Sequence, residues 1–508
     1  MRQLALSTLA LLGFFTACTP RTARTVSSAP KPAATAPAAD LLTVRSNIER
    51  DIRYLASDEL RGRDTGSPEI DEAAEYIAEA FRAAGAQPVP GADGYFHPIA
   101  LERRPAVTGG SVSIADATYA YLDDFVAIHP VAGDFSGRVL YFEYGTAEEM
   151  AGADLSGALV VVNAGGPEAG DPNAYFAMGE DKRARVQAGG GIGLIELFRF
   201  SGVPWAALTR YFGKATLGLT SDGESRDVPH VWIHDPKAEA AKVAAEAAGT
   251  AGRLDIDRPS AEPVPARNVL ALVPGTDPRL REQYVLLGAH YDHVGVDGSR
   301  GGQDSIFNGA RDNAIGTAAL LQTARALAAN PPMRSVIFAA WTAEEKGLLG
   351  SEAYAKSPLI PLASTVFNLN MDGAGYDDTT SISVIGLGRT SVDALVEAAA
   401  APNGLRVGGD PAPEQGLYDR SDNVNFAAAG VPAINVSPGA TGFTDEILKY
   451  YHQAGDEADS LDFDYLARYT ATIADFAARL SDAPRRPAWT AGDKYEAAGD
   501  ELYGASKQ

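Results

Sequence analysis

The chain has 508 residues, of which 45% are hydrophobic and 21% are charged, the balance of an ordinary globular protein. A single hydrophobic core rarely grows to this length, so we expect two or more structural units. With 66 acidic and 43 basic residues the formal net charge is −23. This charge argues against nucleic acid as a partner, because a phosphate backbone needs a basic surface.

The first residues have the pattern of an export signal. Arg2 is followed by an apolar run over residues 4–15 and then by Thr16, Ala17 and Cys18. The run is too short to hold a helix stably across a bilayer, and it fits a cleaved secretory signal. Because Cys18 is the sole cysteine, no intramolecular disulfide can form.

The residues Phe15-Thr16-Ala17-Cys18 resemble a bacterial lipoprotein cleavage box. The resemblance implies a lipid on Cys18, loss of residues 1–17 as a signal peptide, and attachment to a membrane. The alternative is an ordinary signal peptide with an incidental cysteine. Either interpretation predicts an exported protein of the periplasm or cell envelope. Thr19 stands where an aspartate is associated with inner-membrane retention, which favours the outer membrane.

Ordered structure is expected to begin near residue 41. Residues 18–40 are rich in Ala, Pro, Ser and Thr without apolar periodicity, which predicts a flexible linker. Apolar residues at helical spacing then predict amphipathic helices around residues 48–55 and 73–81. The loop between them carries Arg61 and Arg63. These arginines could bind a substrate carboxylate or the domain's own acids, and we favour the second.

Residues 111–264 differ in sequence pattern from the rest of the chain. Short β-type runs alternate there with turns rich in Gly and Pro, which predicts a small, inserted β-rich domain. His129, His230 and His234 fall in this stretch without a cluster of further metal-ligand residues. We expect these three histidines to be structural or to lie on the surface.

From residue 265 onwards strand and helix patterns alternate. Continuous apolar runs predict buried strands at residues 284–287, 335–341, 365–371, 382–385 and 433–436. The alternation predicts a three-layer α/β/α domain with a mostly parallel central sheet. We assign residues 41–110 and 265–485 to this domain and 486–508 to a C-terminal tail. In such folds ligands bind at the carboxyl ends of the strands.

Metal-ligand residues follow the first of these strands. His290 stands in V-L-L-G-A-H-Y-D-H-V-G, and Asp292, two residues later, can lean to the same side. Asp292 is either the acceptor that fixes the imidazole or a neighbouring support. By the same alternation His293 is expected to point the other way and to be structural. Asp312 opens a helix in N-G-A-R-D-N-A-I-G. It could cap that helix or bridge two cations.

The later strands end in further ligand-type residues. Glu344 and Glu345 are adjacent, so their side chains diverge, and one can bind a metal while the other faces a water. Asp372 could be a turn residue, and His452 in its aromatic loop could serve packing alone. As a set, two imidazoles and three carboxylates with a spare carboxylate suit two divalent metals and a general base. The set predicts a hydrolase.

The motifs resemble those of the co-catalytic di-zinc aminopeptidases of clan MH. The resemblance covers residues 41–110 and 265–485 and rests on G-A-H-Y-D-H-V-G, N-G-A-R-D-N-A-I-G-T-A-A-L-L, T-A-E-E-K-G-L-L-G-S, N-M-D-G and S-D-N-V-N-F-A-A-A-G-V-P-A. Residues 111–264 look, more loosely, like the protease-associated domain that many members carry as an insert.

The resemblance implies an enzyme that removes N-terminal residues from peptides with a water activated by two Zn²⁺ per chain. Glu344 would be the general base on that water, and Asp292 would support the ligands without binding metal. The implied zinc ligands are His290 and Asp372 for one ion, Glu345 and His452 for the other, and Asp312 between them.

Two residues depart from the family pattern, Arg311 and Asn423. Neither position is a metal ligand in the family, so the departures bear on substrate preference and not on the reaction. Alternatives are another metal-dependent amidohydrolase, a carboxypeptidase-like exopeptidase of the same fold, and a non-catalytic binding module. Presence of all five ligands and of Glu344 argues against the binding module.

Overall fold

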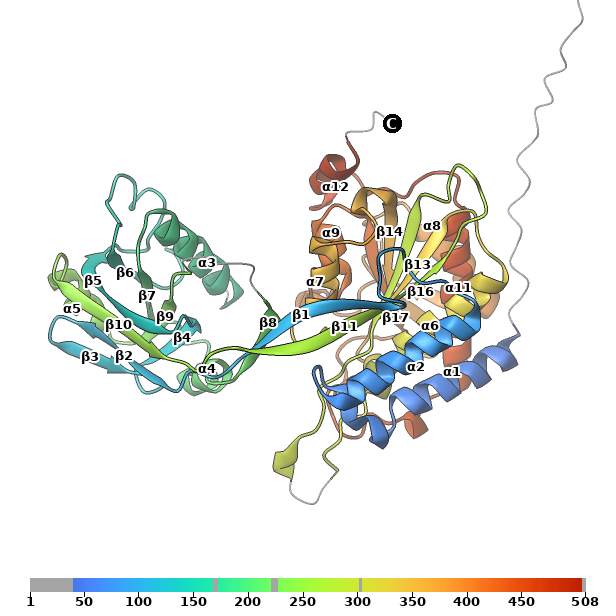
Figure 1. Cartoon of the computed structure of the whole chain (residues 1–508), viewed down its shortest axis with the longest axis horizontal. Helices are drawn as coiled ribbons and strands as arrows, with labels where there is room; N and C mark the ends of the chain where they lie inside the picture. The colour runs from blue at the N-terminus through green and yellow to red at the C-terminus, as the bar shows by residue number, and fades with distance from the viewer. Residues whose placement is uncertain (1–39, 168–171, 221–226, 301–303, 505–508) are drawn as a thin grey trace, which may run out of the picture. The chain divides into compact units, whose positions relative to one another are not determined.

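The computed structural model describes residues 40–167, 172–220, 227–300 and 304–504 (Figure 1). The expected signal peptide and linker, Cys18 included, lie outside these residues. The described strands form two sheets, one of nine and one of eight strands. Within the described part of the chain no helix is both long and apolar enough to cross a membrane.

The nine-stranded sheet has the order β16-β15-β17-β14-β12-β13-β11-β1-β8. Its strands are β1 (Phe96–Arg104), β8 (Thr216–Leu219), β11 (Glu262–Val273), β12 (Tyr284–His290), β13 (Ser335–Trp341), β14 (Thr365–Asn370), β15 (Ser381–Ile385), β16 (Arg406–Gly408) and β17 (Ala433–Pro438). The centre, β13-β12-β14-β17, is parallel, while β15 pairs with β17, and β11 with β13 and β1, in the antiparallel sense. The predicted parallel sheet is therefore its central part.

Helices cover both faces of this sheet, because alternate residues of a strand point to opposite faces. Leu287 of β12 packs in one core cluster and its neighbour Leu286 in another. The first cluster includes α1 (Leu41–Leu55), α2 (Pro68–Ala84), α6 (Ile315–Ala329), α8 (Asp393–Ala400) and α11 (Phe463–Asp482). The second includes α7 (Leu349–Lys356), α9 (Asn423–Ala428) and α12 (Glu496–Tyr503), on the opposite side in Figure 1. The predicted three-layer α/β/α fold is confirmed.

Local sequence explains where the helices begin and end. Helix α2 starts after Ser67, whose hydroxyl accepts a hydrogen bond from the Ile70 N–H, and it has Pro68 at its first position. It ends at Gly85, whose φ of 83° is the left-handed conformation that favours glycine. At α11 the Asp462 carboxylate caps two main-chain N–H groups.

The eight-stranded sheet is built from residues between 109 and 257. Its strands are β2 (Gly109–Ile114), β3 (Ala117–Ala120), β4 (Phe125–His129), β5 (Gly133–Tyr141), β6 (Ala158–Asn163), β7 (Gly193–Phe198), β9 (His230–His234) and β10 (Ala251–Asp257). Helices α3 (Pro172–Ala188), α4 (Trp205–Phe212) and α5 (Glu239–Glu246) belong to the same stretch. Strand β8 also lies in this stretch, yet it pairs with β1 of the other sheet, Leu219 opposite Leu101.

A buried charge network lies within this second unit, the eight-stranded sheet with helices α3, α4 and α5. The Lys182 ammonium donates to Glu196 Oε1 at 2.6 Å, and the other oxygen of Glu196 lies 2.8 Å from His230 Nε2 and 2.6 Å from Trp232 Nε1. All four side chains are at most 3% exposed. His230 is thus a structural residue, as its sequence context predicts. The Glu196 carboxylate compensates the free-energy cost of burying the Lys182 charge.

Residues 486–504 pack against the domain of the nine-stranded sheet and form more than a tail. Trp489 Nε1 donates to the Gly430 carbonyl at 3.1 Å, and Arg389 Nε lies 2.7 Å from Asp493 Oδ2. Helix α12 follows.

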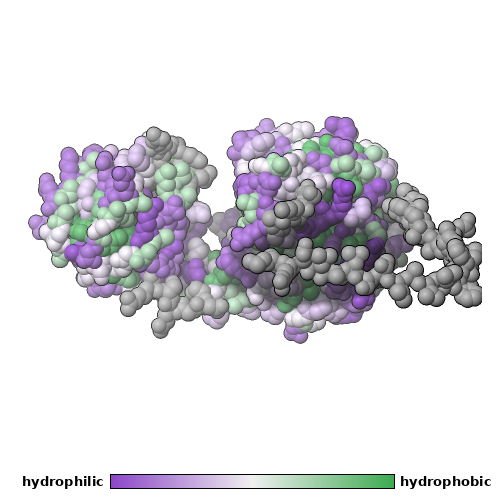
Figure 2. Space-filling model, turned by 90° about the horizontal axis from the view of Figure 1, so that it is seen from above, coloured by the Kyte–Doolittle hydropathy of each residue, from purple (hydrophilic) through white to green (hydrophobic). Residues whose placement is uncertain are grey.

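On the face shown in Figure 2 hydrophilic residues predominate and apolar ones form small patches. Such scattered apolar residues need no partner to explain them.

Candidate active site

The residues expected to bind metal come together at one edge of the nine-stranded sheet. His290 ends β12, while Glu344 and Glu345 follow β13 and Asp372 follows β14. Asp312 lies in the turn that leads into α6. His452 lies in the loop after α10 (Asp445–Leu448). The parallel strands β12, β13 and β14 bring their carboxyl ends to the same edge, as the fold requires.

The ligand atoms form two groups that share Asp312. In the first group His290 Nε2 lies 3.2 Å from Asp312 Oδ1 and 3.1 Å from Asp372 Oδ1. In the second group His452 Nε2 lies 3.1 Å from Asp312 Oδ2 and 3.2 Å from Glu345 Oε2. Ligands bound tetrahedrally at about 2.0 Å lie about 3.3 Å apart. The donor set and its spacing therefore fit two zinc ions with Asp312 between them.

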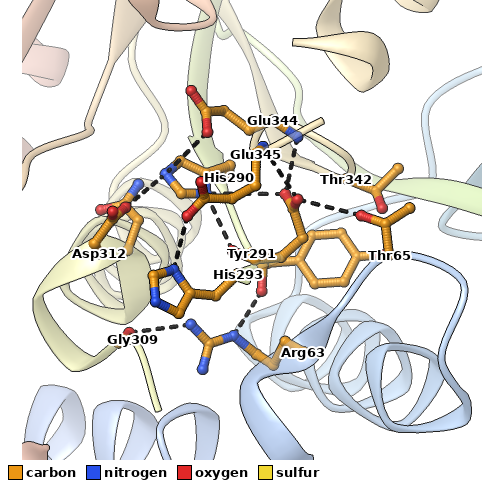
Figure 3. A network of polar contacts seen from close by, with 12 residues as sticks. Arg63, Thr65, His290, Tyr291, His293, Gly309, Asp312, Thr342, Glu344 and Glu345 are labelled. Atoms are coloured by element: carbon orange, nitrogen blue, oxygen red, sulfur yellow. Dashed lines mark hydrogen bonds and ion pairs between the residues drawn. The ribbon is translucent and has the colours of Figure 1, made fainter. Parts of the chain in front are cut away.

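His293 is itself one of the residues of the second group, contrary to the sequence expectation (Figure 3). Its Nδ1 lies 2.7 Å from Glu345 Oε1, the oxygen that does not face His452. This separation is that of a hydrogen bond and is shorter than the ligand spacings. Strand alternation failed here because β12 ends at His290 and the chain turns. His293 can hold Glu345 so that one oxygen remains for a metal.

Of the two roles expected for Asp292, its contacts favour that of a neighbouring support. The His290 Nδ1 lies 3.2 Å from the Asp292 main-chain carbonyl but 3.8 Å from its carboxylate. The carboxylate instead accepts hydrogen bonds from the Glu344 N–H at 3.0 Å, the Glu345 N–H at 3.3 Å and the Thr65 hydroxyl at 3.2 Å. Burial raises the pKa of Asp292 to about 6. Asp292 thus fixes the backbone that carries both glutamates.

Arg63 is the buried anchor of two ligand-bearing loops (Figure 3). Its guanidinium, 1% exposed, donates to the carbonyls of Tyr291 at 2.7 Å, Asn308 at 2.7 Å and Gly309 at 3.0 Å, and also to that of Leu55. The expectation that it pairs with an acid is wrong, because carbonyls take its donors. Burial lowers its pKa to about 10. Arg61 does pair with an acid, Glu69, at 3.4 Å.

Arg311 joins the Asp312 turn to the loop that bears His452. Its main-chain N–H donates to Asp456 Oδ2 at 2.9 Å, and its Nη1 lies 3.1 Å from Asp456 Oδ1. The guanidinium also stacks over the Tyr450 ring at 3.6 Å. This departure from the family pattern is thus accommodated by a buried ion pair. Asp456 was not predicted from the sequence, because its partner Arg311 is 145 residues away and no motif links the two.

The electrostatics show an excess of negative charge at the site. Although burial opposes it, Glu344 and Asp372 raise the pKa of His290 well above its usual value. Burial would raise the pKa of Glu345, yet hydrogen bonds to His293 and His452 hold it at about 2. Burial raises the pKa of Glu344, which belongs to neither ligand group. Divalent cations would supply the positive charge that the protonated imidazoles supply without them.

One pocket opens onto these residues. It is lined by Asp312, Glu344, Glu345, Asp372 and His452, and further out by apolar side chains that include Ile385, Phe443 and Ile447. A donor set for divalent metal at the strand ends of an α/β fold, with the partly buried carboxylate of Glu344 beside it, defines the class of metal-dependent hydrolases.

Comparison with known proteins gives the family. Residues 268–477 match Peptidase family M28. The matched residues carry the candidate site, so this domain is similar to the members of that family. The match begins after the second unit, so the resemblance of residues 111–264 to a protease-associated domain stays a prediction.

Individual relatives are distant. The chain is 30% identical over 245 residues to a probable zinc metalloprotease of Pyrenophora teres f. teres, covering 44% of this chain and 50% of the relative. It is 30% identical over 223 residues to the probable lipoprotein aminopeptidase LpqL of Mycobacterium tuberculosis, covering 39% of this chain and 42% of that relative. The chain thus spans about half of the length of the first of these curated relatives.

Among solved structures, the aminopeptidase from Aneurinibacillus sp. strain AM-1 superimposes with a TM-score of 0.54 at 20% identity. The similarity covers 86% of this chain and 93% of that one. At this identity the likeness concerns the fold.

Proposed function

We propose that the protein is an exported aminopeptidase that uses two zinc ions. The observation that carries the proposal is the pair of ligand groups that share Asp312, with Glu344 left free beside them. His290 and Asp372 would hold one ion, Glu345 and His452 the other. When bound, the two ions would polarise the scissile carbonyl and lower the pKa of a water.

Glu344 is the residue we assign to proton transfer. Its carboxylate lines the pocket, with Oε2 3.9 Å from His290 Nε2, and its main-chain N–H is fixed by Asp292. Burial raises its pKa, which suits a base that later acts as an acid. It would take a proton from the attacking water and deliver it to the leaving nitrogen. Tyr451 and the apolar wall of the pocket would exclude bulk water.

A free substrate amine distinguishes this proposal from other peptidase activities. We expect the purified, zinc-loaded protein to release the N-terminal residue of aminoacyl anilides and short peptides. N-acetylated versions of the same substrates should be inert, because the blocked amine cannot enter. A mass-spectrometric time course on matched free and acetylated peptides measures this. Equal cleavage of both, or removal of C-terminal residues, would contradict the aminopeptidase assignment.

We also propose that Cys18 carries a lipid anchor, supported by the cleavage-box resemblance. Cys18→Ser should abolish processing after residue 17 or release the enzyme from membranes, because the cysteine sulfur is the atom that would carry the lipid. Membrane fractionation and mass spectrometry of the N-terminus measure this, with Thr19→Ser as the matched control. Wild-type protein that is soluble and begins at another residue would refute the anchor.

A further inference from the structure

The candidate active-site pocket has one guanidinium in its lining. Arg420 lines it together with the ligand residues and the apolar side chains. Arg420 is exposed, and its side chain has no hydrogen bond or ion pair to any residue that the structure describes. By contrast, the other two arginines near the site, Arg63 and Arg311, have their donors taken by carbonyls and by Asp456. Arg420 has its donors free.

The main chain beside Arg420 is fixed against the metal ligands. The Ser421 hydroxyl donates to Asp372 Oδ2 and accepts from Asn370 Nδ2 at 2.7 Å. On the other side, the Tyr418 hydroxyl donates to the Ala433 carbonyl at 2.9 Å, and Asn423 Nδ2 donates to the Tyr418 carbonyl at 3.0 Å. Both flanks are thus anchored to the sheet and to a ligand. The main chain that carries Arg420 is therefore fixed beside the pocket, and the guanidinium is free to meet a ligand there.

The charge of the pocket favours an anion at this place. Two divalent cations would balance the carboxylates of Asp312, Glu344, Glu345 and Asp372 even with all four ionised. Arg420 then leaves the pocket with an excess positive charge. An arginine fork matches the geometry of a carboxylate.

We propose that Arg420 binds a carboxylate of the substrate and makes the enzyme selective for peptides that place an anion in this pocket. The inference rests on the proposed function for the position of the substrate amine. Two sources supply the same chemistry: an acidic side chain on the N-terminal residue, or the C-terminal carboxylate of a dipeptide. Both bring a carboxylate within a few bonds of the scissile peptide.

The test measures binding without turnover. Zinc-loaded Glu344→Gln protein is titrated calorimetrically with two pairs of ligands. Glu-Gly-amide against Gln-Gly-amide reports on a side-chain carboxylate, and Leu-Gly against Leu-Gly-amide reports on a main-chain carboxylate. We expect the acid of at least one pair to bind about tenfold more tightly than its amide. The added substitution Arg420→Gln should reduce this ratio to about one, and Arg420→Lys should restore part of it.

The matched control is Arg485→Gln, which removes an exposed arginine that does not line the pocket. It should leave both ratios as they are. Equal binding of acid and amide in both pairs, or a preference that survives Arg420→Gln, would overturn the proposal. Hydrolysis of Leu-Gly-amide by the protein with Glu344 intact is measured in parallel. If Leu-Gly-amide is not hydrolysed, the aminopeptidase proposal fails, while the ratios of binding affinity still test the role of Arg420.

Discussion

Glu344→Gln is expected to keep both zinc ions and to lose between about 100-fold and 10,000-fold in kcat. The amide retains the shape of the side chain but cannot accept the proton of the attacking water. Because Glu344 belongs to neither ligand group, metal content should not change. Steady-state rates on an aminoacyl anilide, with elemental analysis of the same sample, measure both effects.

Its neighbour should behave differently. Glu345 Oε2 lies 3.2 Å from His452 Nε2 in the second ligand group. Glu345→Gln should therefore weaken zinc binding at one site, and the rate should rise again as zinc is added. Glu246→Gln, an exposed glutamate on α5, serves as the control and should change neither property. If Glu344→Gln loses zinc while Glu345→Gln keeps it, the two roles have been assigned in the wrong order.

Removal of zinc should abolish activity and lower the melting temperature. The site holds Asp312, Glu344, Glu345 and Asp372 close together, and without cations protons on the imidazoles offset part of their repulsion. Zinc at 1,000 times its dissociation constant would stabilise the folded state by about 4 kcal/mol per site. Differential scanning calorimetry before and after chelation measures this shift.

Titration of the chelated protein with zinc gives the stoichiometry. We expect activity to return in full at two equivalents per chain, in step with the rise in melting temperature. Full activity at one equivalent would rule out the co-catalytic pair. A variant with His452→Ala should bind one ion fewer, since His452 belongs to the second group alone.

The sequence by itself determined the kind of domain and the set of residues to inspect. Buried strands are continuous apolar runs, and a ligand placed after such a run must lie at the sheet edge, so His290 and Asp372 could be located from periodicity alone. The antiparallel flanks of the sheet were not predicted, because the apolar pattern of a strand carries no direction. Helix α12 was missed because its eight residues give too little periodicity.

Only the tertiary structure decided how the site residues are held. Which oxygen of Asp312 faces which histidine depends on the path of a turn, and turns have no period. The carbonyls that Arg63 binds belong to residues as far as 246 positions away, and a main-chain carbonyl leaves no mark in a sequence. His293 was misplaced because the alternation was carried beyond His290, where β12 ends. Arg420 became notable only because, beside a pocket of paired charges, folding left it without a partner.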